Sequence, residues 1–232
     1  MNDSPFIHLA VRSSYSLLES MITSKALAAW AVEHSMPAVA VTDRNNLFGA
    51  LERSEVMAEQ GVQPIMACCF DIVEDEVRSE TSRLSLYAQD EVGYARLMKL
   101  SSFAYLESED GTPRLKREHI LTDTDGLIAL TGGAEGAIGL LCQKGKQERA
   151  GEVLAELAGA FPGRCYVEIT RHGSDAEALC EASMLQLAYE QDLPLVATHD
   201  ARFLEPKFVE AHDALMCISN GEYLGQEDRH RV

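Results

Sequence analysis

Short apolar runs alternate with longer segments of helical spacing along the whole sequence. The runs are continuous, which is typical of strands buried on both faces of a parallel sheet. We predict seven strands, at residues 6–11, 38–41, 64–70, 84–88, 126–130, 165–169 and 195–198. Helices are predicted between them, at residues 24–34, 47–60, 91–105, 147–161, 175–191 and 206–219. The expected fold class is therefore α/β with a parallel sheet, either an open doubly wound sheet or a barrel.

Nothing in the sequence divides the chain. There is no internal repeat, low-complexity tract or linker, so residues 1–232 are treated as one domain with surface loops at 74–82 and 108–117. The last residues, Glu-Asp-Arg-His-Arg-Val, close neither a helix nor a turn, and we expect a piece of a longer chain. No apolar run approaches the roughly 20 residues that span a bilayer. The N-terminus also lacks the pattern of a secretion signal, so a cytoplasmic location without membrane contact is expected.

Composition and charge narrow the function classes. Apolar residues make up 46% of the chain, which indicates a folded core. The formal net charge is −17, and a surface this acidic repels a phosphate backbone, so the chain alone is not expected to hold DNA strongly. The acidity is compatible with solubility alone, with a metal site, or with a basic protein partner. The six cysteines form no C-x-x-C pair and are predicted to be buried, reduced thiols rather than zinc ligands.

Two aspartates directly follow apolar runs. They are Asp43 and Asp200, the latter preceded by His199. In parallel α/β folds the carboxyl ends of strands gather ligands and catalytic groups, and such residues would suit a metal-dependent hydrolase. The competing interpretation is that both aspartates cap the helix or loop that follows. Gly132 and Gly133, which follow another run, are interpreted as a tight turn and not as a phosphate cradle.

Six segments carry a family resemblance. They are FIHLAVRSSYSLLES, MPAVAVTDRNNLFGALE, GVQPIMACCFDI, GLIALTGG, YVEITRHG and LPLVATHDARFLEPKFVEAHDAL. In order and spacing they resemble the PHP (polymerase and histidinol phosphatase) domain that opens the alpha subunit of bacterial DNA polymerase III. The resemblance covers essentially the whole chain and implies a distorted seven-stranded (β/α)7 TIM-like barrel. It also implies a role in DNA replication, as part of a DNA-directed DNA polymerase (a nucleotidyltransferase) whose catalytic carboxylates lie beyond Val232.

The resemblance also implies a metal site that has lost most of its ligands. Metal-competent members of the family are similar to three-metal phosphoesterases with His, Asp, Glu and Cys ligands. Carried over position by position, four ligands remain in this sequence: Glu19, Asp43, His172 and Asp200. Seven other ligand positions hold different residues: Ala10, Arg12, Arg44, Cys69, Arg83, Gly133 and Arg202.

Four of these seven replacements are arginines. A cation at the position of a metal ligand repels the metal. We therefore predict that these arginines substitute for the charge of the metal and form ion pairs with Glu19, Asp43 and Asp200. No catalytic residue and no cofactor is expected in the chain itself. The alternative is Zn, Mn or Mg at a residual site formed by the remaining ligands.

The role implied by the resemblance is architectural. The chain would support the rest of the polymerase alpha subunit and provide a docking face for a separate proofreading exonuclease subunit, and would meet DNA only through the parent polymerase. One alternative is a residual metal-dependent 3′–5′ exonuclease or phosphoesterase. Another is a stand-alone PHP phosphatase, such as a histidinol phosphatase, against which the polymerase-type segments and the missing ligands argue.

Overall fold

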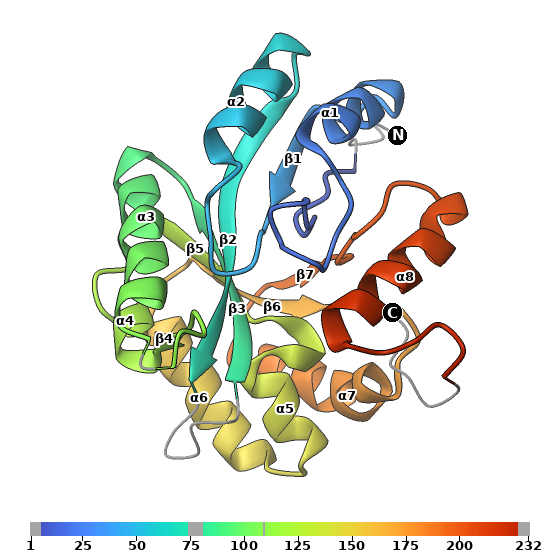
Figure 1. The fold of residues 1–232 in the computed structure, drawn as a ribbon. Helices are drawn as coiled ribbons and strands as arrows, with labels where there is room; N and C mark the ends of the chain where they lie inside the picture. Colours follow the sequence, from blue (N-terminus) through green and yellow to red (C-terminus); the bar gives the residue numbers. More distant parts are fainter. Residues whose placement is uncertain (1–5, 74–80, 109, 227–232) are drawn as a thin grey trace, which may run out of the picture. The chain divides into compact units, whose positions relative to one another are not determined.

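The computed structural model describes residues 6–73, 81–108 and 110–226 (Figure 1). These residues form two compact units. The first contains the described residues up to Ile65 together with those from Asp200 onward, and the second runs from Met66 to His199. The C-terminal residues 227–232, on which the expectation of a longer chain was based, lie outside the described residues.

The first unit is built around one short strand and three helices. Its elements are α1 (Ser24–Glu33), β1 (Ala38–Val41), α2 (Ala50–Glu59), η2 (Pro206–Phe208) and α8 (Val209–Asn220). The α1 helix begins at Thr23, whose hydroxyl accepts a hydrogen bond from the backbone N–H of Ala26. Helices α1 and α2 pack against each other. They bury an apolar cluster that includes Val11, Leu27, Val39 and Met57, so hydrophobic burial holds this unit together.

The predicted first strand, residues 6–11, is wrong in extent. Only Val11 pairs, through isolated parallel bridges to Val41 and Ala201. The backbone N–H of Ala40 donates to the carbonyl of His8, but that of Thr42 donates to the carbonyl of Val11. Two steps along β1, from Ala40 to Thr42, therefore match three steps along the other segment, from His8 to Val11. The extra residue between His8 and Val11 interrupts a regular ladder.

The second unit contains the larger part of the sheet. Its strands are β2 (Gln63–Val73, which starts in the first unit), β3 (Thr81–Ala88), β4 (Leu115–Lys116), β5 (Leu127–Leu130), β6 (Cys165–Ile169) and β7 (Leu195–Ala197). The strands follow the order β2-β3-β5-β6-β7, and β4 pairs with β2. The β5–β6, β6–β7 and β2–β4 pairs are parallel, whereas β2–β3 and β3–β5 are antiparallel.

The fold is therefore α/β with a mixed sheet, and the prediction of an all-parallel sheet was wrong at β3. Residues 74–80 connect β2 to β3, and so short a segment cannot make the crossover of about a dozen residues that a parallel pair needs. Thr81 and Ser82, expected in a loop, belong to β3, and residues 74–80 lie outside the described residues. The other predicted loop, residues 108–117, contains β4 and the start of α4 (Arg117–Leu121); residue 109 lies outside the described residues.

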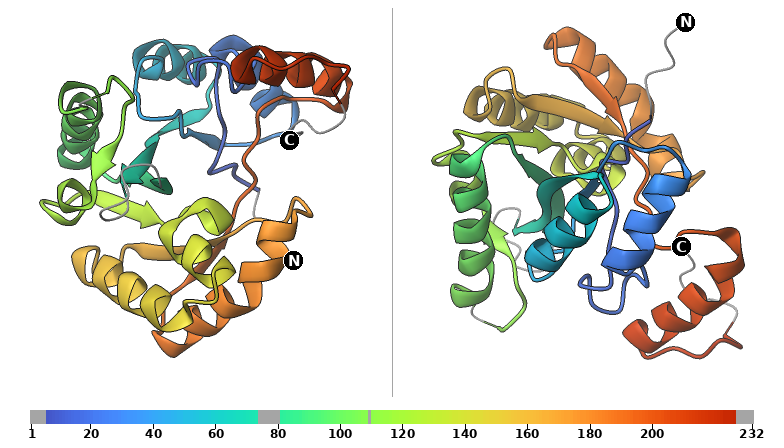
Figure 2. Two further views of the ribbon diagram at one scale, coloured as in Figure 1. Left: turned by 60° about the horizontal axis from the view of Figure 1, so that its bottom comes forward. Right: turned by 90° about the horizontal axis from the view of Figure 1, so that it is seen from above.

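Helices cover the sheet of the second unit. They are α3 (Glu91–Leu106), α4, η1 (Gly133–Glu135), α5 (Ala137–Gln143), α6 (Gln147–Ala160) and α7 (Asp175–Glu190). In Figure 2 (left), α5, α6 and α7, coloured from yellow-green to orange, lie side by side. They share an apolar cluster with Val167 of β6. Helix α5 was not predicted, since its seven residues are too few to show a clear period.

The cysteines are packing residues, as predicted. All six are free thiols and all are buried. Burial raises the pKa of the Cys165 thiol to about 12, which keeps it protonated and unreactive. No helix among the described residues is long and apolar enough to cross a membrane.

Candidate functional site

Asp43 lies directly after β1 and is fully buried. Its Oδ1 atom accepts hydrogen bonds from the backbone N–H of Ser13 and the hydroxyl of Ser16, both at 2.8 Å. Its Oδ2 atom accepts one from the Ser13 hydroxyl at 2.7 Å and one from Nη1 of Arg53 at 3.1 Å. The carboxylate thus joins the loop after Val11 to helix α2.

The cation on Asp43 is Arg53, which the sequence analysis did not name. Its side chain is 1% exposed, and Asp43 Oδ2 accepts the one hydrogen bond that its guanidinium makes within the described residues. Arginine in a helix is normally solvated, so the residue drew no attention in the sequence. The available hint was that Arg53 is the sole cation on a helix with three glutamates.

Asp200 lies between two of the predicted arginines. Arg12 Nε donates to its Oδ1 at 2.8 Å, and Arg202 Nη2 donates to its Oδ2 at 3.0 Å. Arg12 is itself buried and also donates to the carbonyl of Thr42 at 2.6 Å. Burial opposes ionisation of Asp200, but the two guanidinium groups outweigh it and hold the pKa of this carboxyl well below its ordinary value.

Glu19 pairs with Arg44 in the same unit, at 2.5 Å. Its backbone carbonyl lies 2.9 Å from Nε2 of His212, a buried histidine of α8. Ala10, at one of the ligand positions that this sequence has lost, is also buried. In the first unit, Glu19, Asp43 and Asp200 therefore each form an ion pair with an arginine. Three of the four predicted arginines take part in these pairs.

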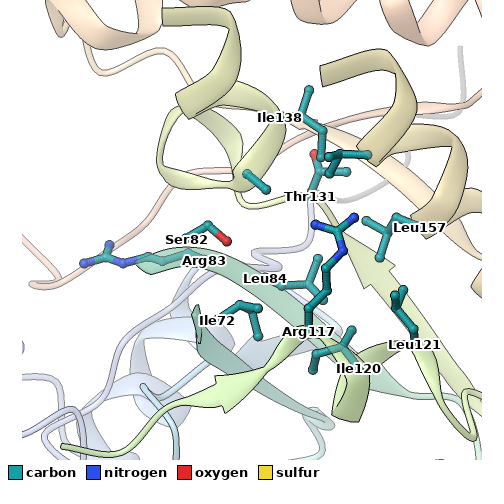
Figure 3. Close-up of a pocket in the computed structure, with 12 residues that line it drawn as sticks. Ile72, Ser82, Arg83, Leu84, Arg117, Ile120, Leu121, Thr131, Ile138 and Leu157 are labelled. Carbon is teal, nitrogen blue, oxygen red and sulfur yellow. The ribbon is translucent and has the colours of Figure 1, made fainter. Parts of the chain in front are cut away.

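Arg83 does not take part in these pairs. It lies on β3 in the second unit and forms an ion pair with Glu135 of η1. Figure 3 shows its guanidinium turned away from an adjacent pocket, while that of Arg117 points into the pocket. The described residues that line this pocket include no His, Cys, Asp or Glu, so they offer no ligand for a metal and no acid or base.

Cys69 and Gly133 have structural roles in the second unit. Cys69 is buried in β2, opposite Ser85 of β3. Gly132 and Gly133 both adopt left-handed backbone conformations and form the predicted turn after β5.

His172 follows β6 and contacts two titratable neighbours. Its Nδ1 atom lies 2.9 Å from Oε1 of Glu177, and its ring centre lies 4.5 Å from that of His199. The other Glu177 oxygen accepts hydrogen bonds from the backbone N–H groups of His172, Gly173 and Ser174. These bonds cap the N-terminus of α7. Burial opposes ionisation of Glu177, but bonds from Thr170, Ser174 and His172 outweigh it and lower the pKa of this carboxyl to about 2.

Glu168 is a buried carboxylate that the sequence analysis missed. Its Oε2 atom accepts the N–H of Gly132 at 2.9 Å, and its Oε1 accepts the hydroxyl of Thr198 at 2.5 Å. It thereby ties the ends of β5, β6 and β7 together. A glutamate inside the apolar run of Cys165–Ile169 was the available signal, because buried carboxylates need partners.

Acidification is expected to destabilise the chain below about pH 4. The folded-state pKa values of Glu177 and Asp200 are lowered, so their contribution is present above the unfolded values of roughly 4 and is lost as pH falls towards 2. For Glu177 alone this loss is about 3 kcal/mol. Urea unfolding at a series of pH values measures it. A Glu177→Gln variant should be less stable at pH 7 and should lose less stability on acidification, and an unchanged slope would contradict the assignment.

Two of the four retained ligand positions, Asp43 and Asp200, do not fit a divalent metal. Both oxygens of Asp43 and both of Asp200 already accept hydrogen bonds, and a guanidinium lies against each carboxylate. A cation so close repels a second cation. Within residues 6–73, 81–108 and 110–226, no group of three or more His, Cys, Asp and Glu side chains is placed to hold a metal ion.

Comparison with known proteins finds alpha subunits of DNA polymerase III among the relatives of this chain. A 43% identical match is the DNA polymerase III subunit alpha of Caulobacter vibrioides, covering 98% of this chain and 20% of the relative. The subunits of the same name in Rickettsia prowazekii and Escherichia coli are 36% and 31% identical, over 98% and 100% of this chain and 19% and 20% of theirs. The chain therefore spans about a fifth of the length of the curated relatives it matches.

Solved structures share the fold at low sequence identity. A candidate metal-dependent phosphoesterase from Bifidobacterium adolescentis aligns with a TM-score of 0.56 and 13% identity, over 86% of this chain and 89% of that one. An amidohydrolase from Chromobacterium violaceum, with bound sulfate and no metal, aligns with a TM-score of 0.57 and 12% identity, over 90% and 96%.

The family itself follows from a match to a domain model. The model of the PHP domain matches residues 8–172, which is most of the chain and includes parts of both units. The chain belongs to the PHP domain family.

Proposed function

We propose that this chain is the N-terminal PHP module of a bacterial DNA polymerase III alpha subunit and that its role there is structural. The relatives named above support this identification of the parent protein, because their similarity extends over 98% or more of this chain. The parent would add deoxynucleotides to a primer in DNA replication, in the cytoplasm. Its polymerase carboxylates would lie outside residues 1–232, and DNA would be bound through the rest of the subunit.

The fold we propose for the whole chain is the distorted seven-stranded barrel of the family, formed by residues 1–232 as one domain. The PHP-like fold of the solved structures supports this proposal. So does the recurrence of strand and helix in both units.

The observation that carries the structural role is the way the surviving carboxylates are neutralised. Asp43 accepts hydrogen bonds from Ser13, Ser16 and Arg53, and Asp200 has a guanidinium on each side. We propose that these cations replace the charge that metals supply in other members, so that the site needs no cofactor and performs no phosphoester hydrolysis. Such buried pairs hold the loops after Val11, β1 and β7 in place, and breaking one is costly.

A docking role for a separate proofreading exonuclease subunit is the second part of the proposal. The strongly acidic surface supports a protein partner in preference to direct contact with DNA, since the charge of −17 repels phosphates. Residual exonuclease activity and a stand-alone phosphatase are disfavoured by the same ion pairs.

The full-length polymerase tests the structural role. Asp43→Ala should lower the melting temperature and the polymerase activity together, with unchanged activity per folded molecule. Glu33→Ala, which removes an exposed carboxylate from α1, serves as the matched control and should change neither. Loss of a nuclease activity at an unchanged melting temperature would contradict the proposal.

A further inference from the structure

Four large apolar side chains are exposed together in the first unit. Leu17 and Leu18 lie in the loop after Val11, Phe48 lies just before the N-cap of α2, and Leu51 lies in its first turn. They are exposed by 70%, 45%, 57% and 71% respectively. Single exposed apolar residues are common, but a group of four on adjoining segments is typical of a binding surface.

The two segments that carry these side chains are tied to each other. The Tyr15 hydroxyl donates to Oε2 of Glu52 at 2.7 Å, and Asn46 Nδ2 donates to the Tyr15 carbonyl at 3.0 Å. The Tyr15 ring lies over Gly49 so closely that a Cβ at this position would overlap it. The two segments are therefore held next to each other, which lowers the entropy cost of binding at this surface.

Leu18 adopts a backbone conformation that leucine avoids. Its φ angle is +62°, in the left-handed region that favours glycine. The loop keeps a leucine there and exposes it, although a glycine would relieve the strain. Backbone strain of this kind clusters at functional and ligand-binding sites.

The exposed face of α2 continues from Phe48 and Leu51 as a stripe of acids. Glu52, Glu55 and Glu59 follow at helical spacing, all exposed. Glu55 and Glu59 are a like-charged pair four residues apart, and Glu59 lies at the negative end of the helix dipole, so both arrangements weaken the helix. No cation of α2 offsets them, because Arg53 is buried on Asp43.

We propose that this face, formed by Leu17, Leu18, Phe48, Leu51 and the α2 glutamates, binds a helical protein segment with leucine-type residues at one end and lysines or arginines along the rest. Apolar burial would supply affinity, and the charge of the glutamates would set orientation and the choice of partner. The net charge of −17 opposes both a nucleic acid and a second copy of this chain at the surface.

The test uses synthetic helical peptides of about 18 residues, labelled for fluorescence anisotropy. One carries leucines at one end and lysines along the rest, and two matched peptides replace either the lysines by glutamates or the leucines by serines. We expect the leucine–lysine peptide to bind the 232-residue chain at least about tenfold more tightly than either matched peptide.

Variants locate the binding site. Leu17→Ser with Leu51→Ser should weaken binding by about tenfold or more. Glu55→Gln with Glu59→Gln should weaken it about threefold and reduce its salt dependence. Leu18→Gly should weaken binding while raising the melting temperature, which separates a lost contact from lost folding. Leu106→Ser, at an equally exposed leucine of α3, should leave binding unchanged.

Two results would overturn the proposal. One is equal binding by the wild type and the leucine variants, which would mean that any cationic peptide adheres to an acidic protein. The other is concentration-dependent dimerisation that Leu51→Ser abolishes, which would make a second copy of the chain the occupant of the surface.

Discussion

Replacing Asp43 with alanine is expected to lower the free energy of unfolding by about 3–5 kcal/mol. The substitution leaves the buried guanidinium of Arg53 without its carboxylate and removes the acceptor of the Ser13 and Ser16 hydroxyls. A buried charge without a partner is among the most destabilising defects in a protein. Urea unfolding followed by circular dichroism measures the loss.

Companion variants identify the cause of that loss. Asp43→Asn keeps an acceptor but removes the charge, so it should cost less than alanine. The double substitution Asp43→Leu with Arg53→Met replaces the pair by apolar side chains and should recover the part of the loss that is due to the unpaired guanidinium, but not the part due to the Ser13 and Ser16 donors. If Asp43→Ala costs no more than Glu33→Ala, the buried pair does not stabilise the first unit.

Gly132→Ala in the second unit is expected to lower the free energy of unfolding by about 3 kcal/mol. Gly132 has φ of +81°, which costs a non-glycine residue about 1–2 kcal/mol. A Cβ at this position would also overlap the backbone carbonyl of Arg83, and relieving such overlap costs about 1–3 kcal/mol. The shift would disturb the hydrogen bond from the Gly132 N–H to Glu168. Thermal and urea unfolding both report the effect.

Gly163→Ala is the matched control for that substitution. Gly163 has a similar φ of +70°, but no atom lies within 4 Å of a Cβ at this position. The free energy of unfolding of its alanine variant should fall only by the cost of the left-handed backbone conformation, about 1–2 kcal/mol. Equal losses at the two glycines would show that the close approach to Arg83 has no energetic consequence.

The sequence predicted most of the elements but not the direction of all strands. Continuous apolar runs such as Ala38–Val41 and Leu127–Leu130 formed strands where expected, because burial on both faces requires them. The antiparallel β3 could not be recognised from periodicity, which carries no information on direction. The strand predicted at residues 6–11 is interrupted by one extra residue between His8 and Val11, and apolar spacing does not show such a bulge.

The candidate site was predicted in part. The pairs of Arg12 with Asp200 and of Arg44 with Glu19 agree with the predicted ion pairs. Arg53 was missed because its partner is set by the tertiary fold and its own helix looks solvated in sequence. Arg83 was assigned to the same group because its position in the family resemblance suggested it, but its partner is Glu135 in the second unit. The role of the arginines as replacements for metal stays a prediction.

Metal content together with nuclease activity of the purified chain tests that role most directly. The chain would be dialysed against zinc and manganese, analysed by inductively coupled plasma spectrometry, and assayed on labelled single-stranded DNA with and without chelator. We expect no stoichiometric metal, no degradation, and a melting temperature that chelator does not change. Two or three bound metals per chain with chelator-sensitive degradation would contradict it, and would make the domain a nuclease.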